Sequence, residues 1–361
     1  MVGTGGALGG SGITTSTDQT VQALESLGHD AVRLVSGARL RRRPNRVNLE
    51  NVAGVVEDSL DVLRGVRCHR PDLVWLHTFG VPTLPALRTL LQVMAARLGC
   101  RSVVVRFQAF ALEDHVRAAG LVQRTALRAI GALSSRLVAE HEAAASALAR
   151  FAPGRVVTLH NWVDVPEAPA PLPEAPPFCV VFIGGLIRRK GLPELLQAMR
   201  KVTDRPIVLR VVGGPGDDGA AVAEEIARSA DDLVAAGSVE LLGLLEPGQV
   251  RDELRRAHLF VLPSRAEGMP LAMLEALAEG RPVLVSDAGN MAEIVRGHGC
   301  GVVLAAVDAD EIARQLTDLM DRPADVTAMG HRAHAAALQG LSASAMAGSV
   351  ERILTAAAPG S

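Results

Sequence analysis

The chain has 361 residues, a formal net charge of −2 at pH 7 and an apolar fraction of 48%. That length suits two domains of ordinary size, each with its own buried core. The charge balance argues against a general nucleic-acid-binding protein, which needs a basic excess to neutralise phosphates. The sequence contains no tyrosine, which excludes a short-chain dehydrogenase that relies on a tyrosine as its acid.

The sequence shows no membrane span and no export signal. No apolar run of roughly eighteen residues is free of charged and turn residues, and the N-terminus has no basic segment followed by an apolar one. The cysteines lie far apart, without a C-x-x-C pair, at Cys68, Cys100, Cys179 and Cys300. Such spacing is typical of reduced, structural thiols. We therefore expect a cytoplasmic protein.

The first half alternates short β-branched runs with amphipathic segments. Strands are predicted at 31–35, 73–77, 102–106 and 156–159, and helices at 14–27 and 83–98. A glycine-rich turn, Gly3 to Gly12, begins almost at the first residue. A doubly wound domain normally opens with a strand before such a turn, and that strand is usually central. Here it is absent or reduced to Met1-Val2, so we expect the true start to lie upstream or the first strand to be truncated.

A proline-rich segment separates the two halves. Residues 166–177 contain six prolines in twelve positions, which predicts a stiff, extended linker. Beyond it, strands are predicted at 179–183, 207–212, 259–262 and 282–285, and helices at 192–202, 220–235 and 310–320. The pattern at 342–357 predicts a last helix that crosses back to the first domain. The predicted parts are therefore 1–165, the linker 166–177, 178–340, and 341–361.

Strand–helix alternation with nearly continuous apolar strands predicts parallel sheets covered on both faces. The expected fold class is α/β, with two Rossmann-like domains whose sheets face each other across a cleft. Ligands of such sheets bind at the carboxyl ends of the strands.

The segment 263–287 has the pattern of a strand end, a loop, a helix and a second strand. Pro270 suits the first turn of the helix, and Gly280 suits its end. The free N–H groups of that helix start can bind a diphosphate. Glu267 stands in the loop, and Glu275 stands in the second turn, where a carboxylate can accept hydrogen bonds from both hydroxyls of a ribose. On spacing alone, a solvated helix residue explains Glu275 equally well.

Glu267 and Glu275 form an E-x7-E pair within P-S-x-x-E-G-x-P-x-x-x-L-E-A-x-A-x-G-x-P-V. This pattern closely resembles the retaining GT-B glycosyltransferases of family GT4. The resemblance continues through 159–164, 182–191, 211–215 and 287–295, and so covers the second half almost continuously. The first half is similar only through short stretches at 9–11, 28–29 and 71–72.

The resemblance implies a role for each matching residue. Glu275 would bind the donor ribose, Glu267 would contact the transferred sugar, and Lys190 would neutralise the donor diphosphate. The other implied donor contacts are Gly10, Ser11, Gly184, Gly185, Gly214, Leu244 near the nucleobase, Gly268, Met269, Pro270 and Leu271. The family is generally metal-independent, so no cofactor is expected besides the nucleotide-sugar donor. The pair Asp308 and Asp310 is interpreted as helix capping.

Two positions depart from the family pattern. Many relatives carry an arginine where this chain has Gly185; Arg188 or Arg189 could supply that charge, although residues of an R-R-K run are as often simply solvated. Relatives often place a histidine where this chain has Gln108, which can hydrogen-bond a hydroxyl but cannot act as a base. His115 is the alternative, or a structural residue. Front-face attack with the donor phosphate as base, the mechanism usually described for the family, survives this change.

One basic segment, Arg39–Arg46, resembles those with which some relatives bind anionic membranes. A solvated loop is the better interpretation, because Pro44 and the lack of an apolar face oppose an amphipathic helix. The expected partners nevertheless include a weak contact with a membrane surface.

The leading hypothesis is a retaining glycosyltransferase that moves a sugar from a nucleotide sugar to a small-molecule, glycan or lipid-linked acceptor. The alternative, motivated by Gly185 and Gln108, is a catalytically impaired relative that serves as a nucleotide-sugar-binding subunit. A sugar-nucleotide epimerase fits the E-x7-E context poorly. The Ala-, Arg- and Leu-rich composition suggests a high-GC bacterium, hence natural-product or cell-envelope glycan synthesis. The sequence leaves the donor base, the acceptor and the oligomeric state open.

Overall fold

The structure is a computed structural model that describes residues 2–3, 12–35 and 49–358. Its contacts divide the chain into two compact units, each with its own sheet and core. The first unit combines Met1–Asn161 with Ser344–Ser361, and the second is Trp162–Ala343. These junctions lie a few residues from the boundaries at 165/166 and 340/341 expected from the sequence.

The first unit is built on a six-stranded parallel sheet with the order β2-β1-β3-β4-β5-β6. Its strands are β1 Val2–Gly3, β2 Leu34–Val35, β3 Leu73–Thr78, β4 Ser102–Phe107, β5 Arg136–Ala139 and β6 Val156–Thr158. Only the last two residues of the strand predicted at 31–35 form β2, and β5 is not among the predicted strands. The short β1 lies next to the edge strand and pairs with β2 on one side and β3 on the other. Every residue of β4 is buried, as in a strand covered on both faces.

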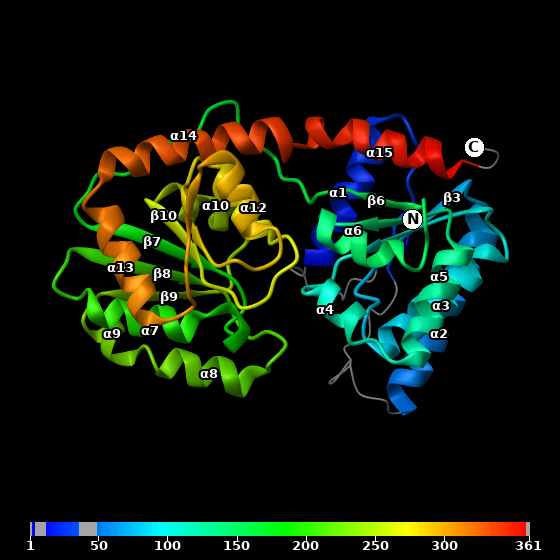
Figure 1. Ribbon diagram of the computed structural model, residues 1–361, viewed down its shortest axis with the longest axis horizontal. Helices are drawn as coiled ribbons and strands as arrows, with labels where there is room; N and C mark the ends of the chain where they lie inside the picture. Colours follow the sequence, from blue (N-terminus) through cyan, green and yellow to red (C-terminus); the bar gives the residue numbers. More distant parts are fainter. Residues whose placement is uncertain (1, 4–11, 36–48, 359–361) are drawn as a thin grey trace. The chain divides into compact units, whose positions relative to one another are not determined.

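The helices of this unit are α1 Gly12–Ser26, α2 Leu49–His69, α3 Thr83–Arg97, α4 Leu112–Arg117, α5 Leu121–Leu133, α6 Glu142–Ala149 and α15 Ala343–Ala357. Three of them, α2, α3 and α5, pack side by side, with α3 in contact with both others (Figure 1). Val93 of α3 and Ile130 of α5 are fully buried in the core beneath them. The last helix, α15, is tied to β4 because the hydroxyl of Ser102 donates to the carbonyl of Ala357 at 2.7 Å.

The second unit contains a six-stranded parallel sheet with the order β12-β11-β10-β7-β8-β9. Its strands are β7 Phe178–Ile183, β8 Ile207–Val212, β9 Val239–Gly243, β10 Leu259–Leu262, β11 Val283–Val285 and β12 Gly301–Val303. The order reverses between β7, which continues to β8, and β10, which follows β9 along the chain but pairs with β7. At such a reversal the loops that follow the strands diverge and leave room for a ligand.

The helical segments of this unit are η1 Arg188–Lys190, α7 Leu192–Lys201, α8 Ala220–Arg228, α9 Asp231–Ala235, α10 Pro247–Arg255, α11 Leu271–Ala278, α12 Met291–His298, α13 Ala309–Met320 and α14 Pro323–Gly340. Helix α7 packs against α13, whereas α11 packs against α10 and α14. In Figure 1 the helices α7–α9 lie on one side of the sheet and α10, α12 and α14 lie on the other. The helix predicted at 220–235 is two helices, α8 and α9.

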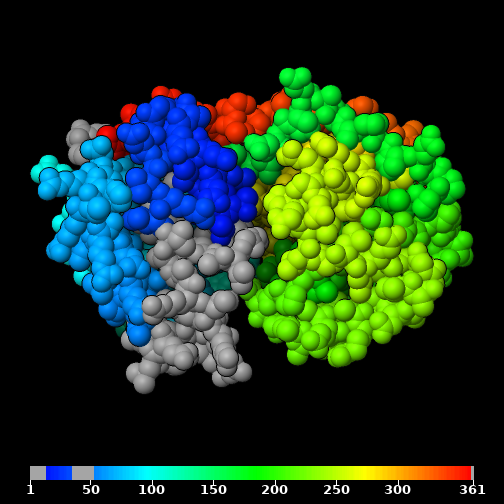
Figure 2. Space-filling view, turned by 180° about the vertical axis from the view of Figure 1, so that it is seen from behind, coloured from blue at the N-terminus to red at the C-terminus, as the bar shows by residue number. Residues whose placement is uncertain are grey.

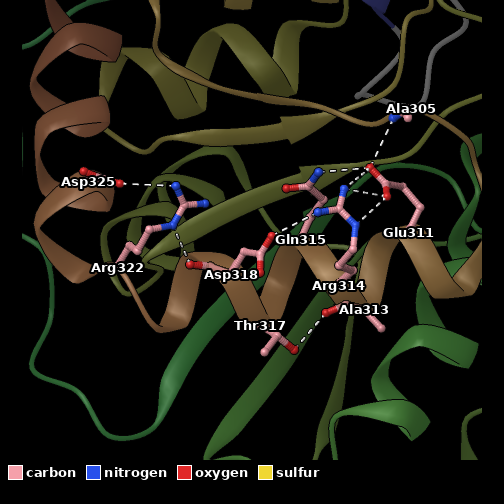
Figure 3. Close-up of polar contacts among 9 residues, drawn as sticks. All are labelled: Ala305, Glu311, Ala313, Arg314, Gln315, Thr317, Asp318, Arg322 and Asp325. Carbon is pink, nitrogen blue, oxygen red and sulfur yellow. Dashed lines mark hydrogen bonds and ion pairs between the residues drawn. The ribbon is translucent and has the colours of Figure 1, made fainter.

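The acidic residues of α13 cap the helix and pair with arginine. The carboxylate of Asp308 accepts from the N–H of Glu311 at 2.8 Å, so the predicted cap is confirmed. Farther along, Arg314 pairs with Glu311 and with Asp318 on the exposed face (Figure 3). Exposed pairs of this kind each contribute at most about 1 kcal/mol. In the described ranges, no group of three or more His, Cys, Asp or Glu side chains is placed to hold a metal ion.

The proline-rich segment is held on the second unit by three side chains that donate to its carbonyls. The fully buried Arg281 donates to Ala170 and, at 3.1 Å, to Pro171. His334 and His258 bond to the carbonyls of Pro166 and Pro173. Figure 2 shows this green stretch on the surface of the unit beside the orange α14. Of the helices that the structure describes, none is long and apolar enough to cross a membrane.

Candidate active site

The loops that follow β7, β10 and β11 interlock at the carboxyl edge of the second sheet. Gly191, at φ +72°, has no room for a side chain, because a Cβ there would lie 2.0 Å from the carbonyl oxygen of Pro263. Gly289, at φ +58°, contacts the next loop in the same way, with the carbonyl oxygen of Gly268 2.1 Å from such a Cβ. These approaches require glycine. They fix the loop after β10 between its two neighbours.

A cationic pair meets a carboxylate where these loops join. The ammonium of Lys190 lies 2.6 Å from Oε1 of Glu267, and the hydroxyl of Ser264 donates to the same oxygen at 2.6 Å. The guanidinium of Arg189 is 3.6 Å from it. Glu267 is buried, and Lys190 and Arg189 are mostly so. The group carries one net positive charge in a site with little water, where such a charge attracts an anion strongly.

Helix α11 begins directly beside this group. Pro270 is its N-cap residue, with extended backbone, so the chain enters the helix from the loop that carries Glu267, Gly268 and Met269. Within the described residues, the N–H groups of Leu271 and Ala272 have no hydrogen-bond acceptor. A helix start with open N–H groups and a neighbouring cation pair can bind a phosphate group.

Glu275 lies one turn into the same helix. Burial raises the pKa of its carboxyl to about 7, and Arg251 opposes this shift only in part. In the described part of the chain, no hydrogen-bond donor or ion-pair partner meets its carboxylate. Its partial burial favours the functional interpretation of Glu275 over that of a fully solvated helix residue, and its role stays a prediction. A half-buried carboxyl without a partner is costly in the free protein and suits a ligand that brings its own donors.

The first unit holds a separate buried polar cluster at the carboxyl ends of β3–β6. The amide of Gln108 bonds to Nδ1 of His77 at 2.9 Å and to Glu140 at 3.4 Å. Asn161 donates to Glu140 at 2.9 Å and accepts from the fully buried Arg106 at 2.9 Å. Burial and the charge of Arg106 lower the pKa of His77 to about 3, so its imidazole is neutral. Burial lowers the pKa of Arg106 to about 10, a shift that Glu140 opposes.

Comparison with known proteins relates the second unit to a protein family. The family described as Glycosyl transferases group 1 matches residues 166–336. D-inositol 3-phosphate glycosyltransferase 1 of Catenulispora acidiphila is 31% identical over 245 residues, which are 63% of this chain and 57% of that protein. TuaC of Bacillus subtilis, named for teichuronic acid biosynthesis, is 37% identical over 118 residues, 33% of this chain and 27% of that one. Residues 166–336 therefore match the glycosyl transferases group 1 family, and the relatives of similar sequence are named as glycosyltransferases.

The chain spans about half or less of the length of these two relatives. Solved structures extend the likeness of fold to the whole chain. HepE of Anabaena, solved in complex with UDP and glucose, has a TM-score of 0.72 at 15% identity, with 98% of each chain covered. Sucrose-phosphate synthase of Thermosynechococcus elongatus has a TM-score of 0.73 at 18% identity, covering 99% of this chain and 96% of that one. The predicted α/β class with two Rossmann-like parallel sheets, of GT-B type, is thereby confirmed.

The predicted donor-side residues fall into four sets, of which the glycine turns after β7 and β8 with Leu244 are described last. Lys190, Arg189, Glu267 and the start of α11 lie together, as described. Arg188 instead pairs with Glu225 at 2.6 Å on the exposed side of η1, so of the two arginines considered in place of Gly185 only Arg189 joins the cationic group. The positions Gly10 and Ser11 lie outside the described residues.

The glycine turns after β7 and β8 touch each other. The N–H of Leu186 donates to the carbonyl of Gly214 at 2.8 Å, and a Cβ on Gly185 would lie 3.6 Å from Gly216. Leu244, from the loop after β9, covers Gly214 and is 79% exposed. An exposed apolar side chain therefore lies beside the glycine turn. The roles of Gly184, Gly185, Gly214 and Leu244 stay predictions.

Sequence reasoning missed the partners of Gln108. His115, the alternative considered for its role, bonds instead to the carbonyl of Ala111, four residues earlier, at 2.9 Å. The signal for His77, Arg106 and Glu140 was present, since a polar residue ends or follows three neighbouring apolar strands. Ser264 was visible only as part of the P-S motif.

Proposed function

We propose that this chain is a retaining glycosyltransferase that moves a sugar from a nucleoside diphosphate sugar to an acceptor hydroxyl. One observation carries the proposal: Lys190 and Arg189 converge on Glu267 directly beside the open start of α11. Two cations and free N–H groups suit a diphosphate, and the adjacent carboxylate suits a sugar at which positive charge develops. The unpartnered carboxyl of Glu275, one turn along, suits the ribose hydroxyls.

In the proposed reaction the bond between the anomeric carbon and the diphosphate oxygen breaks, and the leaving diphosphate gains negative charge. Lys190 and Arg189 stabilise that charge, which is why a metal ion is not required in this scheme. Glu267 holds the developing charge at the anomeric carbon. The acceptor oxygen attacks from the face that the diphosphate leaves, and a phosphate oxygen takes its proton, so the configuration is retained. Gln108, at the carboxyl edge of the first sheet, is proposed to hydrogen-bond an acceptor hydroxyl and not to act as a base.

The donor base proposed first is uracil, because a structural neighbour was solved with UDP. The relatives' names point to a phosphorylated cyclitol or a cell-wall glycan as the acceptor class. We place the reaction in bacterial cell-envelope or natural-product synthesis, in the cytoplasm. These assignments rest on likeness and not on the geometry of the site.

The test is transfer by the purified full-length chain. UDP-, GDP-, ADP- and dTDP-sugars are incubated with inositol phosphate and with glycan acceptors, with and without EDTA. We expect release of one nucleoside diphosphate, a product with the donor's anomeric configuration by NMR, and the same rate in EDTA. An inverted product would refute retention, and a rate abolished by EDTA would refute the metal-free scheme. Nucleotide binding without turnover for any pair would favour the impaired, donor-binding subunit that Gly185 and Gln108 suggest.

A further inference from the structure

The exposed aromatic side chains of this protein lie at one edge of the first sheet. The sequence contains seven phenylalanines and two tryptophans, all within the described residues, and no tyrosine. Seven of these nine side chains are buried: Trp75, Phe107, Phe151, Trp162, Phe178, Phe182 and Phe260. The two others are Phe79, which is 50% exposed, and Phe110, which is 37% exposed. They follow the neighbouring strands β3 and β4 at the carboxyl edge, so their exposure indicates a contact surface there.

The turn that carries Phe79 is fixed to its surroundings. The carbonyl of Thr78 accepts from the N–H of Gln108 at 2.8 Å, and the hydroxyl of Thr78 accepts from the N–H of Gly80 at 2.9 Å. A Cβ on Gly80 would lie 3.1 Å from the ring of Phe107, so the turn packs closely against the end of β4. The backbone before and after Phe79 therefore has little freedom, although the ring itself remains at the surface.

The ring of Phe110 is held beside strained backbone. The next residue, Ala111, has φ +46°, in the left-handed region that alanine rarely adopts. Strain of this kind persists where the surrounding structure enforces it, and it is concentrated at functional sites. The imidazole of His115 meets the ring of Phe110 nearly at right angles, with the ring centroids 5.7 Å apart, and Nδ1 of His115 bonds to the carbonyl of Ala111 at 2.9 Å. Phe110 is thus an oriented side chain that is left exposed.

A polar group suited to a hydroxyl lies between the two phenylalanines along the edge. The backbone of Gln108 bonds to the residue before Phe79, and Gln108 itself comes two residues before Phe110. Its carboxamide is oriented by Nδ1 of His77 and by Glu140. Among the described residues these are its only side-chain bonds, so one N–H and one lone pair remain for a ligand. A sugar ring has hydroxyls around its rim and weakly positive C–H groups on its faces, and it matches this combination of amide and aromatic faces.

The charge of this edge opposes a phosphorylated acceptor. Three described loops follow β3, β4 and β5 and contain no arginine or lysine: residues 79–82, 108–111 and 140–141. Glu140 adds a carboxylate to them. Arg106, in β4, is fully buried and donates to Asn161 and to two backbone carbonyls. A phosphate at these loops would meet a carboxylate without a cation to balance it, whereas a neutral sugar avoids that cost.

We propose that Phe79 and Phe110 bind the acceptor, and that this acceptor is a neutral pyranose at the end of a glycan or glycoside. The aromatic rings contact the C–H face of the pyranose, while Gln108 bonds a hydroxyl at its rim. This inference rests on the proposed function, because it names the acceptor class of that reaction. It selects a glycan over the phosphorylated cyclitol that the name of one relative suggests. An aliphatic alcohol lacks the flat apolar face that the two rings match.

The test measures acceptor binding and sugar transfer separately, on the full chain with and without UDP. Methyl hexopyranosides, inositol phosphate and glycerol are the probes. We expect a methyl pyranoside to bind, with the NMR signals of its ring C–H protons shifted upfield by the aromatic rings. Phe79→Leu/Phe110→Leu keeps apolar side chains but removes the rings, so it should lose these shifts and lower kcat/KM for the pyranoside at least about tenfold. Leu60→Ala, at a leucine of α2 that is 42% exposed, is the matched control and should behave like wild type.

Three results would overturn the proposal: no binding of any neutral pyranoside by wild type, transfer only to inositol phosphate or glycerol, or shifts and kinetics that survive in Phe79→Leu/Phe110→Leu. UDP binding should be unchanged in that double variant, which shows that it is folded. Pyranoside binding with the upfield shifts, but without transfer to any acceptor, would refute the proposed function and keep the binding site. Transfer to a pyranoside without the shifts would keep the proposed function and refute the role of the two phenylalanines.

Discussion

The half-buried carboxyl of Glu275 gives the sharpest prediction about the free protein. Burial raises its pKa from the usual 4.5 to about 7. A carboxyl with a raised pKa destabilises the native state only where it must ionise. The cost is therefore absent below about pH 4.5, grows as the pH rises, and is complete above about pH 7. At about 1.4 kcal/mol per pKa unit, the full cost is about 3 kcal/mol.

Glu275→Gln removes that cost and keeps the shape of the side chain. We expect the variant to match wild type near pH 4.5 and to exceed its stability by up to about 3 kcal/mol at pH 8.5. For a unit of the size of Trp162–Ala343 this corresponds to a rise in Tm of about 6–12 °C. The assay is urea and thermal unfolding from pH 4.5 to 8.5. Glu293→Gln, at an exposed carboxylate of α12, controls for the loss of one negative charge.

A stability difference that does not change with pH would refute this reasoning, because the carboxyl would then not titrate in the range. Nucleotide binding provides a second check on the ionisation of Glu275. If ribose hydroxyls donate to the carboxylate, they favour its ionised form, so nucleotide binding at pH 6.5 should release protons. Calorimetry in two buffers of different ionisation enthalpy measures that release. Glu275→Gln should bind more weakly and release none.

Three further substitutions test the architecture of the site and its support. Lys190→Gln should lower kcat by about 10²-fold or more at saturating donor, because it removes a cation that acts mainly on the leaving diphosphate; steady-state kinetics measures this. Arg281→Met should cost about 3 kcal/mol of unfolding free energy in urea, because it leaves buried carbonyls without donors. Gly289→Ala should weaken nucleotide binding and cost about 2 kcal/mol or more of stability, because its Cβ would meet the carbonyl of Gly268.

The sequence predicted the parts of this fold whose signals are local. The segment from β10 to β11 was found because an apolar strand, Pro270 and Gly280 follow one another at the right spacing, and the structure has Pro270 at the N-cap of α11. Two edge strands, β9 and β12, were not found. Strand β9 has a single buried residue, Val239, and β12 has only three residues, so neither has the continuous apolar run of a central strand.

The partners of individual polar residues could not be predicted, because they come from distant parts of the chain. Arg281 falls at a variable position of the motif and gave no signal, yet its guanidinium holds the backbone of the proline-rich segment 110 residues earlier. Arg188 and Arg189 are neighbours with the same side chain, and only the turn of η1 sends one to Glu225 and the other to Glu267. The sequence shows which polar side chains could form such pairs, and tertiary packing determines which of them do.

The arrangement of the second unit explains how the proposed donor site can hold its charges in place without a ligand. Gly191 and Gly289 bring backbone against backbone on both sides of the loop that carries Glu267, so that loop has little freedom to move. The carboxylate then keeps Lys190 and Arg189 close together, although two cations at that distance would otherwise repel each other. A diphosphate that enters finds both cations already desolvated and oriented, and it need only share them with Glu267. Such a site reorganises little when charge develops, and this is the condition under which fixed charges stabilise a transition state more than they stabilise the substrate.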